Sequence, residues 1–443
     1  MVLRLTEQLS LSRNIAVIGW EPEALIVSVL LAEAKIPNYL VGPFEQSSGA
    51  HSSRHGIEEA LWLLAVHQKS GRIKLLPDSQ QVPFGEITNA IIASHATNPS
   101  DSNRLEMMIR NLAPSLLAGS NLTFTGLCRP NYTSTILRET VEKHSGMRVG
   151  TDLGLFYLPL FWAGEPIQAF REKPKIFAAI DDVASAQVQE TLLQIFPSMS
   201  WTSKIATAEA AGLFTSVYRE VVGALELELA KISENQGVDY GEVLGLCKGS
   251  GMNLSGLSER VFSRDSIGSA IALGASSGKS TAPLIRAAKR INENYQSQVL
   301  QMIKDALGHC GQRLRRSKVA ILGLDGLVRN VWSKPEPPQI LHALRKRGAY
   351  LSLYPGQAES SMITRMVGNG VRVESNLLKA VANANCAVVA LHAPLTGELD
   401  PKKLAMEMRS PAAVCDLTQV LEASNVERAG LFYTSIGRGT VDT

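Results

Sequence analysis

Two short apolar runs, each ending in glycine, constrain the fold of this chain more than any other feature. Residues 14–19 (NIAVIG) lead into a helical stretch over residues 21–34, and residues 39–42 (YLVG) then form a second β-rich run. Residues 318–323 (KVAILG) begin the same kind of pattern near the other end of the chain. A strand, a helix and a further strand in this order predict a βαβ unit with parallel strands. We therefore expect two such units.

The remaining periodicity extends both units and separates them by helices. Residues 207–308 have a helical period almost throughout, so the pattern predicts an all-α segment between two α/β parts. We predict an α/β protein with two Rossmann-like, doubly wound parallel-sheet domains joined by a central all-α domain, with boundaries at 1–205, 206–310 and 311–443. The further predicted strands are 90–94, 122–125, 175–179, 350–353, 387–391 and 413–416, and the further helices are 104–117, 134–144 and 339–347.

Length and composition set the class of protein. A chain of 443 residues exceeds what one core usually supports, so we expect two or three domains. The net charge of +3 creates no field that would favour nucleic acid as a partner. The longest apolar runs, such as 61–66 and 386–391, are far shorter than a membrane span, and the N-terminus has no signal-peptide pattern. We expect a cytoplasmic protein without a membrane partner.

The residue types that bind metals show no ligand pattern. The five cysteines include no C-x-x-C pair, so neither a zinc site nor a disulfide framework is predicted. His51 and His55 have helical ligand spacing but lack a His-Glu-x-x-His arrangement or a third obvious ligand. We predict no metal site.

The first glycine-ended run carries a degenerate dinucleotide fingerprint. The motif G-x-G-x-x-G needs small residues so that the backbone can approach a pyrophosphate at the helix N-terminus. The corresponding residues here are Gly19, Glu21 and Ala24. Glu21 places a negative charge where the pyrophosphate would lie, and residues 41–44 offer no carboxylate for the ribose hydroxyls. We therefore expect no bound cofactor, and no NAD in its usual pose.

Several segments in the right order resemble one enzyme family. Residues 208–229 (AEAAGLFTSVYREVVGALELEL) resemble the central helix of the UDP-glucose/GDP-mannose dehydrogenases, where the pattern is A-E-x-x-K-L-x-x-N. Residues 228–243, 318–324 and 430–439 (GLFYTSIGRG) resemble further segments of that family. Its members use NAD to oxidise the C6 alcohol of a nucleotide sugar to a carboxylate. The resemblance implies the same fold and, for an intact member, the same reaction.

The same resemblance shows four catalytic positions without their chemical groups. Gly212 stands where the family has its lysine, and Ser216 where it has its asparagine. Leu160 replaces the glutamate of a P-E-R segment, and Ser263 lies at or near the counterpart of the cysteine in G-G-H-C-I-P. A serine hydroxyl without a neighbouring base is a poor nucleophile. We therefore predict a catalytically degenerate homologue that acts as a binding or scaffold protein, with an active NAD-dependent oxidoreductase as the alternative.

The resemblance also implies partners. Lys334 lies near the family's arginine for the nucleotide sugar, and Arg438 matches the terminal G-R-G, so both are candidates for binding a sugar nucleotide. A scaffold could instead pair with an active paralogue. The helix over 208–232 implies a homodimer, although ordinary core packing would explain the same stripe. The stripe consists of Leu213, Val217, Val221, Leu225 and Leu229.

Overall fold

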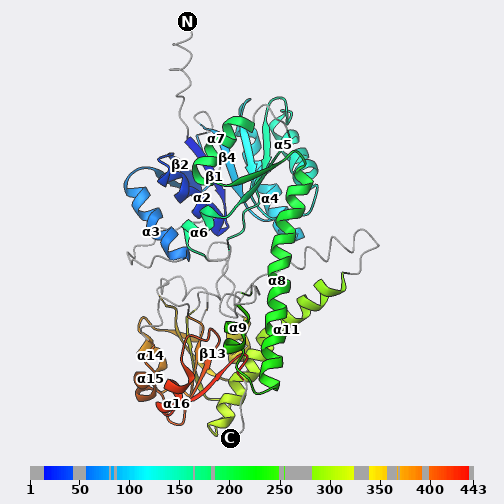
Figure 1. The fold of residues 1–443 in the computed structure, drawn as a ribbon. Helices are drawn as coiled ribbons and strands as arrows, with labels where there is room; N and C mark the ends of the chain where they lie inside the picture. The colour runs from blue at the N-terminus through cyan, green and yellow to red at the C-terminus, as the bar shows by residue number, and fades with distance from the viewer. Residues whose placement is uncertain are drawn as a thin grey trace. The chain divides into compact units, whose positions relative to one another are not determined.

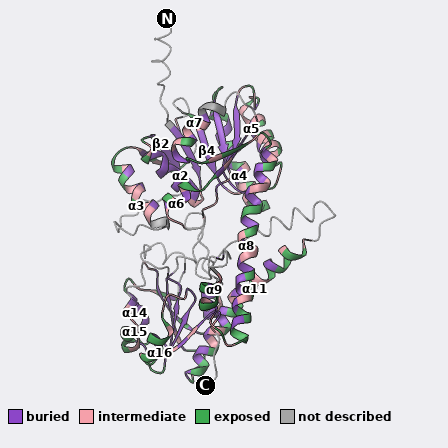
Figure 2. Cartoon of the chain, in the orientation of Figure 1, coloured by how far each residue is buried: buried purple, intermediate pink, exposed green. Residues whose placement is uncertain are grey.

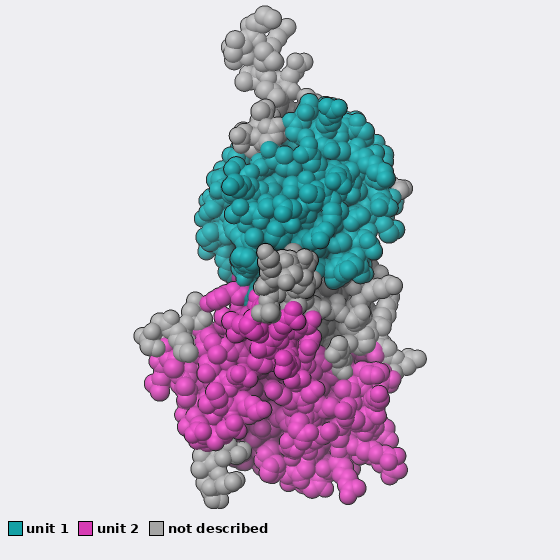
Figure 3. All heavy atoms as spheres, turned by 90° about the vertical axis from the view of Figure 1, so that its right-hand side faces the viewer, with its two compact units in different colours: residues 1–217, 268–280 teal, residues 218–267, 281–443 magenta. Residues whose placement is uncertain are grey.

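The chain divides into two compact units. One comprises residues 1–217 and 268–280, and the other comprises residues 218–267 and 281–443 (Figure 3). The central segment that was predicted as a separate domain contributes residues to both units. The computed structural model describes residues 14–42, 56–78, 81–83, 87–162, 165–180, 185–248, 254, 282–323, 339–356, 367, 370–391 and 399–438.

The first unit is built on a sheet of eight described strands in the order β3-β2-β1-β4-β5-β6-β7-β8. All neighbouring strands are parallel except β6 and β7. Residues 15–18 of β1 are all buried, as expected for a central parallel strand that is covered on both faces. The strands are β1 (Asn14–Gly19), β2 (Asn38–Val41), β3 (Ile73–Leu76), β4 (Ile87–Ala93), β5 (Asn121–Phe124), β6 (Gly154–Tyr157), β7 (Lys175–Ala179) and β8 (Met199–Thr202).

Helices connect these strands, and two of them differ from the prediction. The helix predicted over 104–117 begins at Pro99, because the Asn98 side chain accepts a bond from Asp101 N–H at 3.0 Å and caps its N-terminus, and it ends at Leu112. The helix predicted over 134–144 consists of a π turn followed by α5. The helical elements are α2 (Pro22–Glu33), α3 (Gly56–Lys69), α4 (Pro99–Leu112), η2 (Ala113–Ser115), η3 (Thr133–Leu137), α5 (Arg138–Ser145), α6 (Ile167–Glu172) and α7 (Ser185–Ile195).

The second unit repeats the plan with six described strands, all parallel, in the order β11-β10-β9-β12-β13-β14. The sheets of both units are lined with buried residues (Figure 2). The strands are β9 (Lys318–Leu322), β10 (Tyr350–Tyr354), β11 (Val371–Val373), β12 (Cys386–Val389), β13 (Ala413–Asp416) and β14 (Phe432–Ser435). The helices are α9 (Tyr240–Lys248), α11 (Pro283–His309), α12 (Gln339–Lys346), α14 (Leu377–Val381), α15 (Pro401–Glu407) and α16 (Ala423–Arg428).

The predicted long helix is confirmed and extended. Helix α8 (Ile205–Asn235) spans 31 residues (Figure 1). Its residues are divided between the two units. In each sheet the first strand of the unit is central and the order reverses beside it, which is the doubly wound arrangement of the Rossmann fold. The predicted fold class is therefore confirmed. No helix of the described residues is long and apolar enough to cross a membrane.

Candidate functional site

The first sheet has its topological switch point between β1 and β4, where the strand order reverses. Open α/β sheets bind ligands at the carboxyl ends of the strands at such a point. Gly19 ends β1 there, and a Cβ on Gly19 would lie 1.9 Å from the carbonyl oxygen of Ala93 at the end of β4. Only glycine fits this contact. The turn glycine of the fingerprint is therefore required by packing, whether or not a nucleotide binds.

Three titratable side chains occupy the mouth of this switch point. Glu21 is the N-cap residue of α2, Glu23 lies in its first turn, and His95 follows β4. Their possible ligand atoms lie within 4.8 Å of one another. Burial raises the pKa of the Glu23 carboxyl above its ordinary value; His95 lowers it in part, and Glu21 raises it further. The end of α2 that would hold a pyrophosphate in a dinucleotide-binding protein thus carries two carboxyl groups.

The hydrogen bond of His95 argues against a metal ion at this cluster. His95 Nδ1 accepts a bond from the Leu127 N–H at 2.9 Å. A neutral imidazole that accepts at Nδ1 carries its proton on Nε2, so neither nitrogen is free to coordinate a cation while this bond exists. The remaining ligands would be two carboxyl groups, and burial raises the pKa of one of them, Glu23. The residues present do not fit a metal site.

The loop after β6 is tied to the same helix end. Glu23 Oε1 accepts a bond from the backbone N–H of Trp162 at 2.7 Å. The indole N–H of Trp162 donates to the carbonyl oxygen of Glu165, also at 2.7 Å. The guanidinium group of Arg104 lies 4.7 Å from the centroid of the Trp20 ring, and Trp20 directly precedes Glu21. Glu23 thus ties the first turn of α2 to the segment that follows β6.

The described catalytic counterparts lie in tight apolar packing. Leu160 is completely buried, and its N–H donates to the carbonyl oxygen of Thr125 at 2.9 Å. A Cβ on Gly212 would lie 2.7 Å from the Cβ of Pro159, the residue before Leu160. Ser216, one turn further along α8, is 1% exposed. The structure brings α8 against the segment that contains Leu160 but leaves no room for a side chain at position 212. Ser263 lies outside the described residues.

Glu209 is one of the residues that match the pattern of the resembling family, and its contacts are structural. Its buried carboxylate accepts bonds from the backbone N–H of Asn131 and from the N–H of Thr133 at 2.7 Å. The thiol of Cys128 donates to it at 3.4 Å. Burial, and then the neighbouring Glu209, raise the pKa of Cys128 well above its ordinary value. A buried thiol with a raised pKa is a poor nucleophile, so Cys128 has the character of a structural cysteine.

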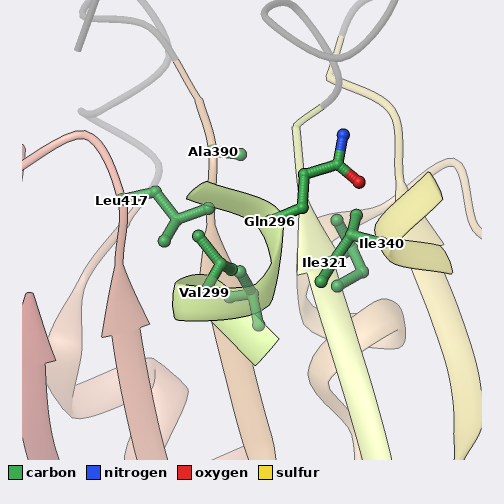
Figure 4. Close-up of a pocket in the computed structure, with 7 residues that line it drawn as sticks. Gln296, Val299, Ile321, Ile340, Ala390 and Leu417 are labelled. Carbon is green, nitrogen blue, oxygen red and sulfur yellow. The ribbon is translucent and has the colours of Figure 1, made fainter. Parts of the chain in front are cut away.

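The described residues at the switch point of the second sheet, between β9 and β12, are mostly apolar. A cavity of about 10 Å³ lies there against α11, with room for about one water molecule (Figure 4). Gln296 is the only polar residue among its described neighbours. Nothing in this lining would hold a phosphate. The lining consists of Gln296, Val299, Ile321, Ile340, Val388, Ala390 and Leu417.

Of the two predicted substrate-binding cations, Arg438 lies among the described residues. Arg438 forms an ion pair with Glu427, with Nη2 and Oε1 2.7 Å apart, and its guanidinium lies 4.9 Å from the centroid of the Tyr433 ring. These contacts hold Arg438 against its own unit and partly neutralise its charge. Lys334 lies outside the described residues.

Comparison with known proteins identifies the fold. No protein-family model and no curated protein matches the sequence. The UDP-D-ManNAc dehydrogenase of Pyrococcus horikoshii is 20% identical with a TM-score of 0.74, over 97% of this chain and 100% of that one. The UDP-glucose dehydrogenase of Pyrobaculum islandicum is 16% identical with a TM-score of 0.72, over 97% and 98%. The chain has the fold of the nucleotide-sugar dehydrogenases.

A third structure gives the same result. The NDP-N-acetyl-D-galactosaminuronic acid dehydrogenase of Methanosarcina mazei is 19% identical with a TM-score of 0.63, over 99% and 98% of the two chains.

The apolar stripe predicted on α8 is only partly buried. Leu213 and Val217 are buried, whereas Leu225 is 48% exposed. A second stripe is exposed to solvent. It consists of Phe214, Tyr218, Leu225 and Ile232, which are 48–67% exposed.

Proposed function

We propose that this chain is a nucleotide-sugar dehydrogenase homologue that does not oxidise its ligand and acts as a binding or scaffold protein in sugar-nucleotide or glycan metabolism. The observation that carries the proposal is the contact between Gly212 and Pro159, because it fills the place from which a catalytic lysine would extend. Leu160 in the same segment offers no carboxylate. Oxidation of an alcohol needs a base and a donor that stabilises the developing charge, and neither is present at these positions.

The cofactor position supports the same proposal. Glu21 and Glu23 place two carboxyl groups at the N-terminus of α2. A bound pyrophosphate would need the backbone N–H groups at this end, and nearby carboxyl groups disfavour a second anion there. Glu23 also holds the backbone of Trp162 over this turn. We infer that the chain binds NAD weakly or not at all. A nucleotide sugar is still a candidate ligand, because Lys334 and Arg438, which the resemblance assigns to it, belong to the second unit, whereas Glu21 and Glu23 belong to the first.

Turnover measurements test this function directly. Full-length protein would be incubated with NAD and, in turn, UDP-glucose, UDP-N-acetylmannosamine and GDP-mannose, while NADH is followed by absorbance. We expect no NADH above background. Steady NADH formation that is abolished in a Ser263→Ala variant would overturn the proposal and establish the alternative, an active oxidoreductase that uses serine-based chemistry.

A second measurement separates binding from scaffolding. Mass spectrometry of small molecules released from the purified protein would detect a retained nucleotide sugar. A released sugar nucleotide supports a binding protein, and its absence together with capture of an active paralogue supports a scaffold.

We also propose that two copies of the chain pair through α8. The exposed stripe of Phe214, Tyr218, Leu225 and Ile232 presents large apolar side chains to water along one helix. Exposed apolar surface of this kind is common at interfaces between subunits. The resemblance of the helix to one that forms a homodimer supports the same assembly.

A further inference from the structure

We propose that the amino-terminal edge of the second sheet binds single-stranded nucleic acid, a role separate from the nucleotide-sugar fold. Residues 312–347 contain nine lysines and arginines and two acidic residues, so this stretch has a net charge of +7. The whole chain has a net charge of only +3. The nearly balanced net charge of the chain therefore hides a strongly basic segment. The expectation that nucleic acid is not a partner was based on the net charge of the whole chain, and it does not apply to the surface of this segment.

The fold gathers this charge on one edge. Residues 313–317 lead into β9 and residues 345–349 lead into β10, while Arg372 lies on β11. These three strands are adjacent and parallel, with Tyr350 paired to Lys318 and Ser352 paired to Arg372. The N–H of Arg316 donates to the carbonyl oxygen of Gly348 at 2.8 Å, which joins the two approach segments. We call this surface the basic edge; its exposed cations are Arg313, Arg315, Arg316, Arg345, Lys346, Arg347 and Arg372.

Little negative charge opposes the basic edge. Among its exposed cations, only Arg372 pairs with a described acid, with its Nε 2.6 Å from Glu374 Oε1. Lys318 beneath the edge donates to the carbonyl oxygen of Ala382 at 2.6 Å. Burial lowers the pKa of Lys318, and the positive charge of Arg372 lowers it further. Cations are thus crowded here without matching anions from the described residues, as expected of a surface that meets a polyanion.

The residue types favour a nucleic acid over other polyanions. Six of the seven exposed cations are arginines, whose planar guanidinium groups bind phosphates with two parallel hydrogen bonds. Tyr350 is 65% exposed at the start of β10, within the basic edge. Aromatic rings among cations are the stacking platforms of single-strand binding surfaces. A membrane surface would favour exposed aliphatic side chains beside the cations, and a protein interface would favour an apolar centre.

Fluorescence anisotropy with full-length protein tests the proposal. The probes are labelled single-stranded DNA and RNA of mixed sequence, about 20 nucleotides long. We expect saturable binding of at least one probe. If about four phosphates are neutralised, the affinity should fall roughly fifty-fold between about 50 mM and about 200 mM salt.

Matched variants locate the binding surface. Arg345→Glu with Arg347→Glu should weaken binding by roughly tenfold or more and reduce the salt dependence. Tyr350→Ala should also weaken it roughly tenfold while leaving the salt dependence unchanged. Lys402→Glu with Lys403→Glu changes the net charge by the same amount at exposed positions at the start of α15, and it should have no effect. Circular dichroism of each variant checks that the fold is retained.

Three results would overturn the proposal. One is the absence of salt-dependent binding to either probe. The second is equal weakening by the control pair, which would indicate a nonspecific charge effect. The third is sedimentation of the protein with vesicles of phosphatidylcholine and phosphatidylserine without any binding to the oligonucleotides, which would assign the basic edge to a membrane surface instead.

Discussion

Gly212 on α8 packs so closely on Pro159 that a Cβ at position 212 would lie 2.7 Å from the Cβ of Pro159 and 3.5 Å from Leu127 Cδ2. This distance is shorter than two carbon atoms can approach without movement of the backbone or the proline ring. The contact joins the helix that resembles a catalytic helix to the segment that resembles a catalytic loop. The contact leaves no space for a side chain at position 212, because the two elements meet where that side chain would begin.

This contact predicts that side chains at position 212 destabilise the protein. Gly212→Ala should lower the free energy of unfolding by about 1–3 kcal/mol, since overpacking forces neighbouring atoms apart. Gly212→Lys should cost more and restore no NADH formation. Urea denaturation followed by circular dichroism measures the change. Gly245→Ala on α9 is the control: no atom lies within 4 Å of its Cβ position, so it should stabilise by about 0.5–1 kcal/mol. Equal stability of Gly212→Ala and wild type would contradict the packing explanation.

The acidic cluster at the first switch point predicts how NAD binding can be changed. In calorimetric titrations at neutral pH, the wild type should give no micromolar dissociation constant for NAD or NADH. Glu21→Gly together with Glu23→Gln should bind more tightly, because both changes remove a carboxylate from the N-terminus of α2. Glu242→Gln removes a carboxylate from the first turn of α9, in the second unit, and should leave NAD binding unchanged. Micromolar binding by the wild type would refute the prediction.

The strand and helix pattern could be predicted from sequence because it depends on local spacing. The strands predicted at 175–179 and 413–416 have the same bounds in the structure. The helix predicted to start at residue 104 starts at Pro99, because its first turn is polar and only the Asn98 cap and the proline mark its beginning. The start of a helix that only a capping residue marks was therefore harder to predict than an element with a regular pattern of apolar residues.

The site was harder to predict because its groups are distant in sequence. The motif drew attention to Glu21, but nothing local indicates that Glu23 and His95 lie beside it. The bond between Glu23 and Trp162 joins residues 139 positions apart. The basic edge is a different case, since the cations of residues 312–347 are visible in the sequence. The net charge of the whole chain is only +3, so this total did not indicate the basic segment.

The exposed stripe on α8 predicts the effect of charge on assembly. Light scattering of the wild type should give twice the chain mass of 47.9 kDa. Tyr218→Asp should shift the protein to the monomer, since a buried unpaired carboxylate costs several kcal/mol at an interface. Leu246→Asp also replaces an exposed apolar residue, 83% exposed on α9, but lies outside the stripe and should leave the dimer intact. A monomeric wild type would remove the support for pairing through α8.

Buried Lys175 at the start of β7 predicts an unusual dependence of stability on pH. Its ammonium group donates to the carbonyl oxygen of Lys173 at 2.7 Å and to that of Phe170, so it caps the last turn of α6. Burial lowers the pKa of Lys175 from 10.5 to about 8. Between these two pH values the unfolded chain holds more protons at this residue than the folded chain does.

It follows that the contribution of Lys175 to the free energy of unfolding rises with pH between about 8 and 10.5. Below pH 8 both states are protonated and the contribution is constant. We expect the stability of the wild type relative to Lys175→Met to increase as the pH is raised from 8 to 10 in urea denaturation. A stability difference for Lys175→Met that stays flat or falls over this range would show that Lys175 keeps an ordinary pKa in the folded protein.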